Sequence, residues 1–381
     1  MKRKLLAFVQ NEIVLMVAGI LALCSCFLTK PSPAYLSYID FRVLALLFCL
    51  MAVVAGMQKL GLFDLLCRAL LARFHTMRAV AILLCLLSFF LSMLLTNDVM
   101  LVTIVPFTLL VLSRVGETKL KVIPLLVMET VSANLGSMLT PFGNPQNLYL
   151  YSEYGFTMGS FLGTMAPYTG LSLLLILLTL LFLTRAVSKE KVVLREDRET
   201  TGARALFRRP ELYLYLVLFV LSLLSVLRIL DERIVLAIVT VSILFVDRRI
   251  LARVDYSLLL TFVFFFVFIG NIGQLAGVRS SLEHLIRGRV LLTAVLTSQF
   301  VSNVPAALLL SGFTEDGRRL LIGTDLGGLG TLIASMASLI SYKFYAAVPG
   351  SKKGAYIGTF SLIGVLFLAV LLGLAFLLGD L

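Results

Sequence analysis

The stretch from Ser132 to Asn147 places two prolines, two glycines and three asparagines inside sequence that is otherwise apolar enough to enter a membrane. A helix that faces lipid cannot carry such a break, because each unsatisfied backbone group in hydrocarbon costs several kcal/mol. Irregular backbone at membrane depth is tolerated only where it is buried in protein or lines a water-filled cavity. The stretch therefore predicts a transmembrane helix that is interrupted beside a polar site.

The composition indicates that this site belongs to a membrane protein. Hydrophobic residues make up 60% and charged residues 14% of the 381-residue chain, which excludes a soluble globular domain and predicts an all-α polytopic membrane protein. The formal net charge of +12 does not indicate a nucleic-acid partner, because the basic residues cluster in loops between apolar runs, as cytoplasmic loops do. The lipid bilayer is the expected partner instead.

The interrupted stretch has a counterpart in the second half of the chain. Residues Asn134 to Thr140 align without a gap on Asp325 to Thr331, and the segments that begin at Asp40 and Asp255 also correspond. Polar breaks at corresponding positions of two halves indicate the binding site of a secondary transporter. The predicted fold has two inverted-topology repeats, each with a re-entrant hairpin and a broken transmembrane helix, and about nine full crossings besides the two hairpins.

Charge and hydropathy give the predicted boundaries and orientation. The first transmembrane repeat covers residues 1–186, a basic cytoplasmic linker 187–210, a connecting span 211–230 and the second repeat 231–381. Basic residues at the N-terminus and in the linker predict that both are cytoplasmic, so the C-terminus is expected outside a plasma (inner) membrane. Basic residues on both sides of 79–111 favour a hairpin there, and two full spans with a tight outer turn are the alternative.

The two hairpin tips and the two breaks are expected to converge if the repeats pack about a pseudo-two-fold axis. Freed backbone groups, amides and hydroxyls can bind an oxyanion through N–H groups and a hard cation through oxygen. The candidate substrate-binding residues are Thr96, Asn97, Gly143, Asn144, Pro145, Asn147, Ser302, Asn303, Thr331, Ser335 and Ser338. The candidate ion-coupling residues are Asp98, Asn134, Gly136 and Asp325.

Three carboxyl groups are predicted at membrane depth, where each costs on the order of 2.5–3.5 kcal/mol on insertion scales. Asp98 in the first hairpin tip is the leading candidate for ion coupling. A desolvated carboxyl favours its neutral form, so it can carry a proton or ionise when a cation arrives. Asp325, like Asn134 opposite it, can instead cap a helix N-terminus, and Glu129 can lie at the membrane interface.

These motifs resemble those of the ion-transporter superfamily, which includes arsenite permeases, citrate permeases, divalent-anion/sodium symporters and a class of sodium/proton antiporters. Thr96-Asn97-Asp98 resembles the hairpin motif of the arsenite permeases, and Gly143 to Asn147 resembles the Gly-x-Pro-x-Asn break of the superfamily. Ser302 to Pro305 and Thr324 to Gly327 resemble the second-half counterparts. The resemblance covers residues 40–378.

In the dicarboxylate symporters both tips read Ser-Asn-Thr, and the resemblance implies that these residues hold sodium and the substrate carboxylate. The matching positions are Thr96, Asn97, Ser302 and Asn303, of which the two asparagines are the candidate sodium ligands. The third position departs from the pattern, because Asp98 carries a charge that repels an anion and Val304 has no polar group. This departure argues against sodium/dicarboxylate symport of the usual kind.

The sequence therefore predicts a secondary active transporter that moves a small oxyanion, carboxylate or metalloid, of the citrate, dicarboxylate or arsenite class, coupled to H⁺ or Na⁺. A sodium/proton antiporter is the alternative. A membrane-embedded enzyme is the remote one, because no Ser-His-Asp or metalloprotease spacing occurs. No cofactor and no metal beyond the coupling ion is expected, and a homodimer is one expected assembly.

Overall fold

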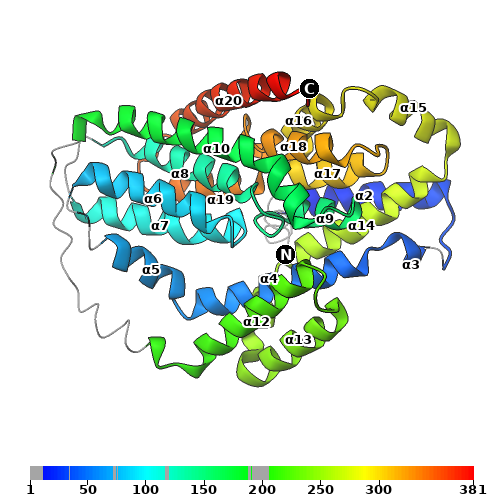
Figure 1. The fold of residues 1–381 in the computed structure, drawn as a ribbon, viewed down its shortest axis with the longest axis horizontal. Helices are drawn as coiled ribbons and strands as arrows, with labels where there is room; N and C mark the ends of the chain where they lie inside the picture. Colours follow the sequence, from blue (N-terminus) through cyan, green and yellow to red (C-terminus); the bar gives the residue numbers. More distant parts are fainter. Residues whose placement is uncertain are drawn as a thin grey trace.

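The computed structural model describes residues 12–33, 35–71, 74, 76–115, 120–187, 190 and 206–381. Within these residues every regular element is a helix (Figure 1), which confirms the all-α prediction. Four of the described helices are long and apolar enough to cross a membrane: Phe41–Lys59, Met158–Leu183, Tyr256–Gly273 and Lys353–Leu378. Residues 1–11 of the predicted first repeat and most of the linker 187–210 lie outside the described residues.

The helices fall into two long series, one in each half of the chain. The first half starts with α2 (Ile13–Leu28) and α3 (Tyr35–Tyr38) and continues with α4 (Phe41–Lys59), α5 (Leu62–Leu71), α6 (Met77–Leu91), α7 (Asn97–Val115), α8 (Val122–Ser137), α9 (Pro145–Glu153), α10 (Met158–Leu183) and η1 (Arg185–Val187). The middle of the chain contains α12 (Pro210–Val226), α13 (Glu232–Asp247) and η2 (Arg248–Arg253). The second half contains α14 (Tyr256–Gly273), α15 (Ala276–Ile286), α16 (Val290–Val301), α17 (Asn303–Ser311), α18 (Gly317–Gly327), η3 (Leu332–Ala334), α19 (Met336–Ala346) and α20 (Lys353–Leu378).

The two segments that were aligned at Asp40 and Asp255 begin their helices in the same way. Asp40 accepts a hydrogen bond from the Val43 N–H at 3.0 Å at the start of α4. Asp255 accepts one from the Leu258 N–H at 2.9 Å at the start of α14. Such a cap satisfies one of the free N–H groups of the first turn and stabilises a helix by about 1 kcal/mol.

Helix packing also follows a similar order in the two halves. α6 packs along α8 in the first half, and α16 packs along α18 in the second. α2 packs on α14, whereas α12 and α13 pack on α4, where Val53 and Val239 belong to an apolar core of their own. Lys59 at the end of α4 forms an ion pair with Asp247 at the end of α13. Figure 1 shows α12 and α13 on the side of the molecule opposite α20.

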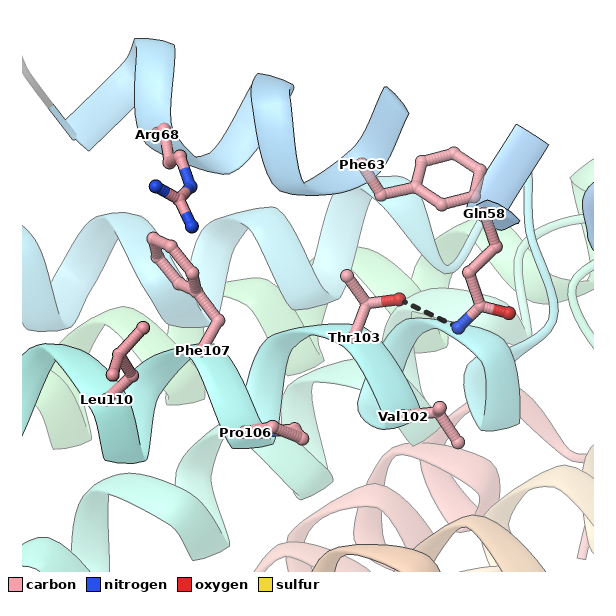
Figure 2. A pocket seen from close by; sticks show the side chains of 8 residues that line it. All are labelled: Gln58, Phe63, Arg68, Val102, Thr103, Pro106, Phe107 and Leu110. Atoms are coloured by element: carbon pink, nitrogen blue, oxygen red, sulfur yellow. Dashed lines mark hydrogen bonds between the residues drawn. The ribbon is translucent and has the colours of Figure 1, made fainter. Parts of the chain in front are cut away.

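The end of α4 and the following helix α5 both face α7. The Gln58 amide near the end of α4 donates a hydrogen bond to the Thr103 hydroxyl of α7 at 3.3 Å (Figure 2). α5 packs beside α7 on the same side. The helix that leaves the first hairpin tip is therefore lined by two elements from outside the hairpin.

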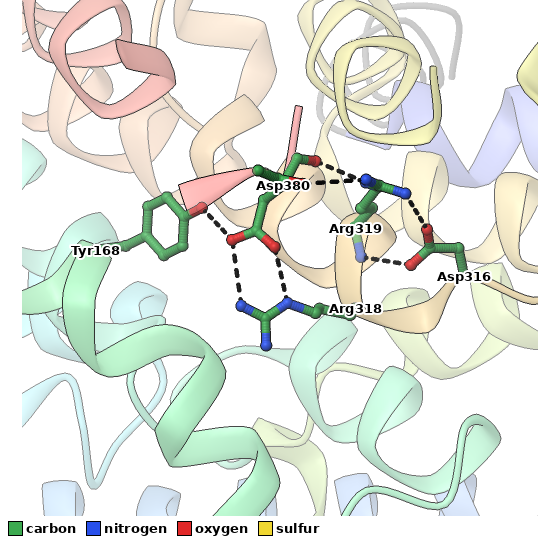
Figure 3. A network of polar contacts seen from close by, with 6 residues as sticks. Tyr168, Asp316, Arg318, Arg319 and Asp380 are labelled. Atoms are coloured by element: carbon green, nitrogen blue, oxygen red, sulfur yellow. Dashed lines mark hydrogen bonds and ion pairs between the residues drawn. The ribbon is translucent and has the colours of Figure 1, made fainter. Parts of the chain in front are cut away.

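The far end of α20 is held by two arginines of α18 (Figure 3). Arg318 donates to both carboxylate oxygens of Asp380, at 2.8 and 3.2 Å, and the Tyr168 hydroxyl of α10 donates to the same carboxylate at 2.8 Å. Arg319 donates to the carbonyl groups of Gly379 and Asp380 at 3.1 and 2.8 Å. Paired hydrogen bonds of this kind are among the strongest that side chains form. They tie α10, α18 and α20 together at one end.

Two expectations about buried polar residues, that Asp325 and Asn134 cap helix N-termini, are wrong. Asp325 does not begin a helix but lies in the last turn of α18, because Asp316 caps that helix one residue before Gly317. Asn134 likewise lies in the last turn of α8. Glu129 is fully buried within the protein and accepts a hydrogen bond from the Thr108 hydroxyl at 2.7 Å.

Candidate functional site

The first break lies between α8 and α9, where the chain turns through residues 138–144. α9 begins with Pro145, whose fixed φ and missing N–H suit the first position of a helix. Gly143 is required in the turn, because a Cβ at this position would lie 2.1 Å from the Ser137 carbonyl oxygen. The interruption that the sequence predicts is present, and it turns the chain back against the end of α8.

Asn134 joins the first hairpin tip to the second half of the chain. Its Oδ1 accepts hydrogen bonds from Asn97 Nδ2 at 2.9 Å and from the Ser335 hydroxyl at 3.1 Å. Its Nδ2 donates to the Ser338 hydroxyl at 3.0 Å. All four side chains are buried. We call these four residues the Asn134 cluster.

Asp325 makes a second contact between the halves, with the start of α9. Gln146 Nε2 donates to Asp325 Oδ1 at 3.1 Å, and the side chains of Asn144 and Asn147 lie beside the same carboxyl group. All four side chains are buried. Within the described part of the chain, Gln146 Oε1, Asn147 Oδ1 and Asp325 Oδ2 have no hydrogen-bond partner. Buried oxygens without donors are the kind of ligand that a hard cation prefers.

The two hairpin tips fold back on themselves in the same way. Asn97 Oδ1 accepts from the Asp98 N–H at 2.9 Å, and Asn303 Oδ1 accepts from the Val304 N–H at 3.0 Å. The Asn97 N–H also donates to the Gly143 carbonyl at 3.2 Å, which joins the first tip to the first break. At the second tip Ser302 has φ 75° and ψ 157°, a conformation that only glycine adopts freely and that costs on the order of 1–3 kcal/mol.

A glutamine that the sequence analysis did not single out holds the second break. Gln299 Nε2 donates to two carbonyl groups at the end of α18, at 2.8 and 2.9 Å, and its Oε1 accepts from the Thr331 N–H at 3.0 Å. The Thr331 hydroxyl donates to the Gln299 carbonyl at 3.2 Å. In the first half the Thr140 hydroxyl donates to the Met93 carbonyl. Met93 precedes Asn97 of the first tip by the same number of residues as Gln299 precedes Asn303 of the second tip. Thr331 therefore secures the break, and its side chain is exposed rather than part of the Asn134 cluster.

Several of the predicted residues stand apart from these contacts. Thr96 and Asp98 are half-buried, and the Asp98 carboxylate makes no hydrogen bond to a described residue. Gly136 serves helix packing, because a Cβ there would lie 2.0 Å from the Phe89 carbonyl oxygen of α6. Pro145 starts α9. Gln146 was missed, although it lies between two predicted residues of the same motif.

Among the described residues, the three acids Asp98, Glu129 and Asp325 have no basic partner. The ion pairs between described residues involve other side chains, and none includes Asp98, Glu129 or Asp325. An isolated charge in such surroundings is costly, so each carboxyl is expected to hold a proton or to draw a cation. The described residues hold no group of three His, Cys, Asp or Glu side chains suited to a resident metal ion.

The sequence profile of the citrate transporter family matches residues 5–314. The chain belongs to the citrate transporter family. The inner membrane protein YbiR of Escherichia coli (strain K12) is 33% identical to it over 308 residues, which cover 80% of each chain. An uncharacterized transporter of Methanocaldococcus jannaschii is 32% identical over 328 residues, which cover 86% of this chain and 85% of that protein. The silicon efflux transporter of Oryza sativa subsp. japonica is 37% identical over 134 residues, which cover 35% of this chain and 27% of that protein.

Membership of the citrate transporter family makes this chain an integral membrane transporter and not an enzyme. It also confirms the resemblance to the ion-transporter superfamily that the tips and the first break carry. The Asn134 cluster and the contacts of Asp325 are then buried polar groups between the two halves of a transporter.

Proposed function

We propose that this member of the citrate transporter family is a secondary active transporter that moves a small oxyanion, carboxylate or metalloid by alternating access, coupled to H⁺ or Na⁺. The observation that carries the proposal is the Asn134 cluster, in which a hairpin tip, a broken helix and the opposite half meet through buried hydrogen bonds. A polar site between two halves can open to either side of the membrane when the halves move against each other.

In this proposal the substrate is held by Gln146 together with the candidate substrate-binding residues of the sequence analysis, which are Thr96, Asn97, Gly143, Asn144, Pro145, Asn147, Ser302, Asn303, Thr331, Ser335 and Ser338. Amide groups at Asn97 and Asn303 provide both N–H donors and carbonyl acceptors, so the site suits an oxyanion or a polyhydroxylated metalloid. The rice relative is a silicon efflux transporter by name, which supports the metalloid class.

The two halves are inverted repeats, residues 1–186 and 231–381, with the linker 187–210 and the span 211–230 between them and about nine crossings besides two hairpins. The N-terminus is cytoplasmic and the C-terminus lies outside an inner membrane. The protein works in the lipid bilayer, where exposed apolar side chains such as Phe27 and Phe245 contact lipid, and a homodimer is one assembly that fits this proposal.

Contacts between helix ends support the proposed order of crossings. Lys59 and Asp247 end the two helices that run toward the cytoplasm, and they pair with each other. Tyr168 lies toward the outer end of α10 and meets Asp380 beyond the outer end of α20. The proposed topology thus brings together only ends that it assigns to the same side.

Cysteine labelling tests this topology. With Cys24 and Cys26 replaced by serine and the remaining Cys49, Cys67 and Cys85 buried, a cysteine introduced at Gly155 is expected to react with a membrane-impermeant reagent only from outside. One at Arg198, in the predicted linker, is expected to react only from the cytoplasm. Reaction of both from the same side would rule out the inverted arrangement.

Ion coupling runs through the acids that have no basic partner. Asp98, beside the first tip, carries a proton or pairs with a cation, and the unpartnered oxygens around Asp325 suit a sodium ion. Asn97 and Asn303 are further sodium ligands in this proposal, and Asn134 and Gly136 position them. The same unpartnered oxygens favour the second candidate, a sodium/proton antiporter in which the cation itself is the substrate.

Transport by reconstituted vesicles tests the function and the role of Asp98 together. We expect the natural protein to accumulate citrate, another dicarboxylate or arsenite only under a proton or sodium gradient. Asp98→Asn is expected to exchange substrate across the membrane but to lose at least tenfold in gradient-driven accumulation, because the variant carboxamide cannot change its charge.

Three results would contradict parts of this proposal. Flux of the natural protein that follows the substrate gradient alone would indicate a channel. Sodium-driven proton movement without any of these substrates would indicate the antiporter. Substrate-driven proton or sodium movement that Asp98→Asn leaves intact would remove Asp98 from the coupling.

A further inference from the structure

A cavity of about 280 Å³ lies between the end of α4, α5 and α7, apart from the Asn134 cluster. Its walls include Gln58 of α4, Phe63 and Arg68 of α5, and Val102 and Phe107 of α7. Figure 2 shows Arg68 extending from α5 toward Phe107, with the Gln58–Thr103 hydrogen bond at the other end of the cavity. Nothing in the proposed function uses this space.

The cavity runs along α7, the helix that begins beside Asp98. Val102, Pro106 and Leu110 line it at intervals of four residues, and Asp98 lies one interval before Val102, at the edge of the lining strip rather than at its centre. At a rise of about 1.5 Å per residue, the wall begins roughly 6 Å beyond Asp98 and continues for about another 12 Å. The cavity thus leads along α7 toward the first hairpin tip.

The lining has the chemistry of a site for a small anion. Apolar walls with a few polar groups are typical of small-molecule sites. Arg68 supplies a guanidinium group, which matches carboxylate and other oxyanion geometry, and it forms no hydrogen bond or ion pair with a described residue. The Gln58 amide and the Thr103 hydroxyl add polar groups nearer to Asp98.

We propose that this cavity is an access site, in which Arg68 binds an anionic substrate on the α5 side before it reaches the hairpin tip. The inference rests on the proposed transport function and assigns it a charge class. A charged Asp98 repels an approaching anion, and the guanidinium group of Arg68 on α5 compensates for that repulsion farther along the cavity. An uncharged metalloid hydroxide meets no such repulsion and has no need of Arg68.

Arg68→Gln tests the access site by transport. In vesicles whose α5 side faces the medium, we expect KM for citrate to rise at least tenfold, whereas KM for uncharged arsenite changes less than twofold. Arg68→Lys is expected to fall between the natural protein and Arg68→Gln, because lysine keeps the charge but not the planar fork. Arg78→Gln is the matched control, since Arg78 is a half-buried arginine at the start of α6 and does not line the cavity.

A second experiment measures anion binding in the cavity without the need for transport. In protein with Cys24→Ser and Cys26→Ser, the thiol introduced by Val102→Cys is expected to react with a soluble reagent, because Val102 is 37% exposed. Citrate or sulfate should slow that reaction at least threefold with Arg68 present and not with Arg68→Gln. Protection by anionic phospholipid but by neither soluble anion would mean that Arg68 binds a lipid headgroup, which overturns the proposal.

The two measurements separate this inference from the proposed function. If Asn97→Ala abolishes transport while Arg68→Gln changes neither KM nor protection, the transporter stands and the access site is wrong. If citrate protects Val102→Cys only with Arg68 present in a protein that transports nothing, the anion site stands and the transport proposal fails. An equal rise in KM for citrate and arsenite would also overturn the charge-selective role of Arg68.

Discussion

Alanine in place of Asn97 is expected to reduce transport at least 100-fold, to the level of protein-free vesicles, while the chain stays folded in the membrane. The amide of Asn97 donates to Asn134, accepts from the Asp98 N–H and is almost fully buried. Its removal leaves those groups without a partner, a cost of about 1–3 kcal/mol that a large membrane protein can survive. It also removes the tip from the Asn134 cluster, and alignment of the site depends on that link. Asn303→Ala is expected to act in the same way at the second tip.

Asn271→Ala is the matched control for this experiment. Asn271 of α14 is equally buried and its Nδ2 donates to the Ser25 and Tyr35 hydroxyls, both at 2.9 Å, but it lies outside the site. We expect Asn271→Ala to lower thermal stability by a similar amount and to retain transport. Equal transport by Asn97→Ala and Asn271→Ala would show that Asn97 has only a structural role.

Gly136→Ala is expected to cause the largest loss of stability. The added Cβ would lie 2.0 Å from the Phe89 carbonyl oxygen, which belongs to the backbone of α6 and cannot rotate away. Overpacking a dense interior costs typically 1–3 kcal/mol, and a collision with backbone belongs at or above the upper end of that range. We expect little monodisperse protein after extraction, and a melting temperature several degrees lower in what remains.

Gly358→Ala provides the comparison. Gly358 lies inside α20 with nothing near its added Cβ, so alanine should stabilise the helix by up to about 1 kcal/mol. The melting temperature of both variants is measured in the same detergent, with size-exclusion chromatography used to monitor the loss of monodisperse protein on heating. Equal melting temperatures for Gly136→Ala and Gly358→Ala would mean that α6 can move away from the added Cβ on α8 without loss of folding free energy.

The sequence predicts the helical class and the first break because both depend on local chemistry. Long apolar runs require helices in lipid, and the prolines and glycines around Thr140 interrupt one wherever the chain folds. The contact of Gln146 with Asp325 joins residues 179 positions apart, and no local pattern indicates such a pair. Gln299 was missed for a related reason, since it resembles an ordinary residue of α16 until the second break lies beside it.

The start of α18 differs from the prediction that Asp325 begins a helix. Arg318 and Arg319 lie in the first turn of α18 instead, where Asp380 and Asp316 bind them. The cavity beside Arg68 was not predicted, because it depends on how α5 meets α7, which hydropathy does not specify.

The bend at Ser302 bears on how a ligand would be recognised. Among the described residues, Ser302 and Arg228 are the non-glycine residues with positive φ, so the first tip has no equivalent strain. Ordering one residue costs about 1–2 kcal/mol, and at the second tip folding has already met that cost. A ligand seated there would keep more of its contact energy, and calorimetry would report a smaller entropic penalty than for a mobile segment. The second tip is thus held by a strained backbone, whereas the first tip is held by the hydrogen bonds of Asn97 to Asn134 and Gly143.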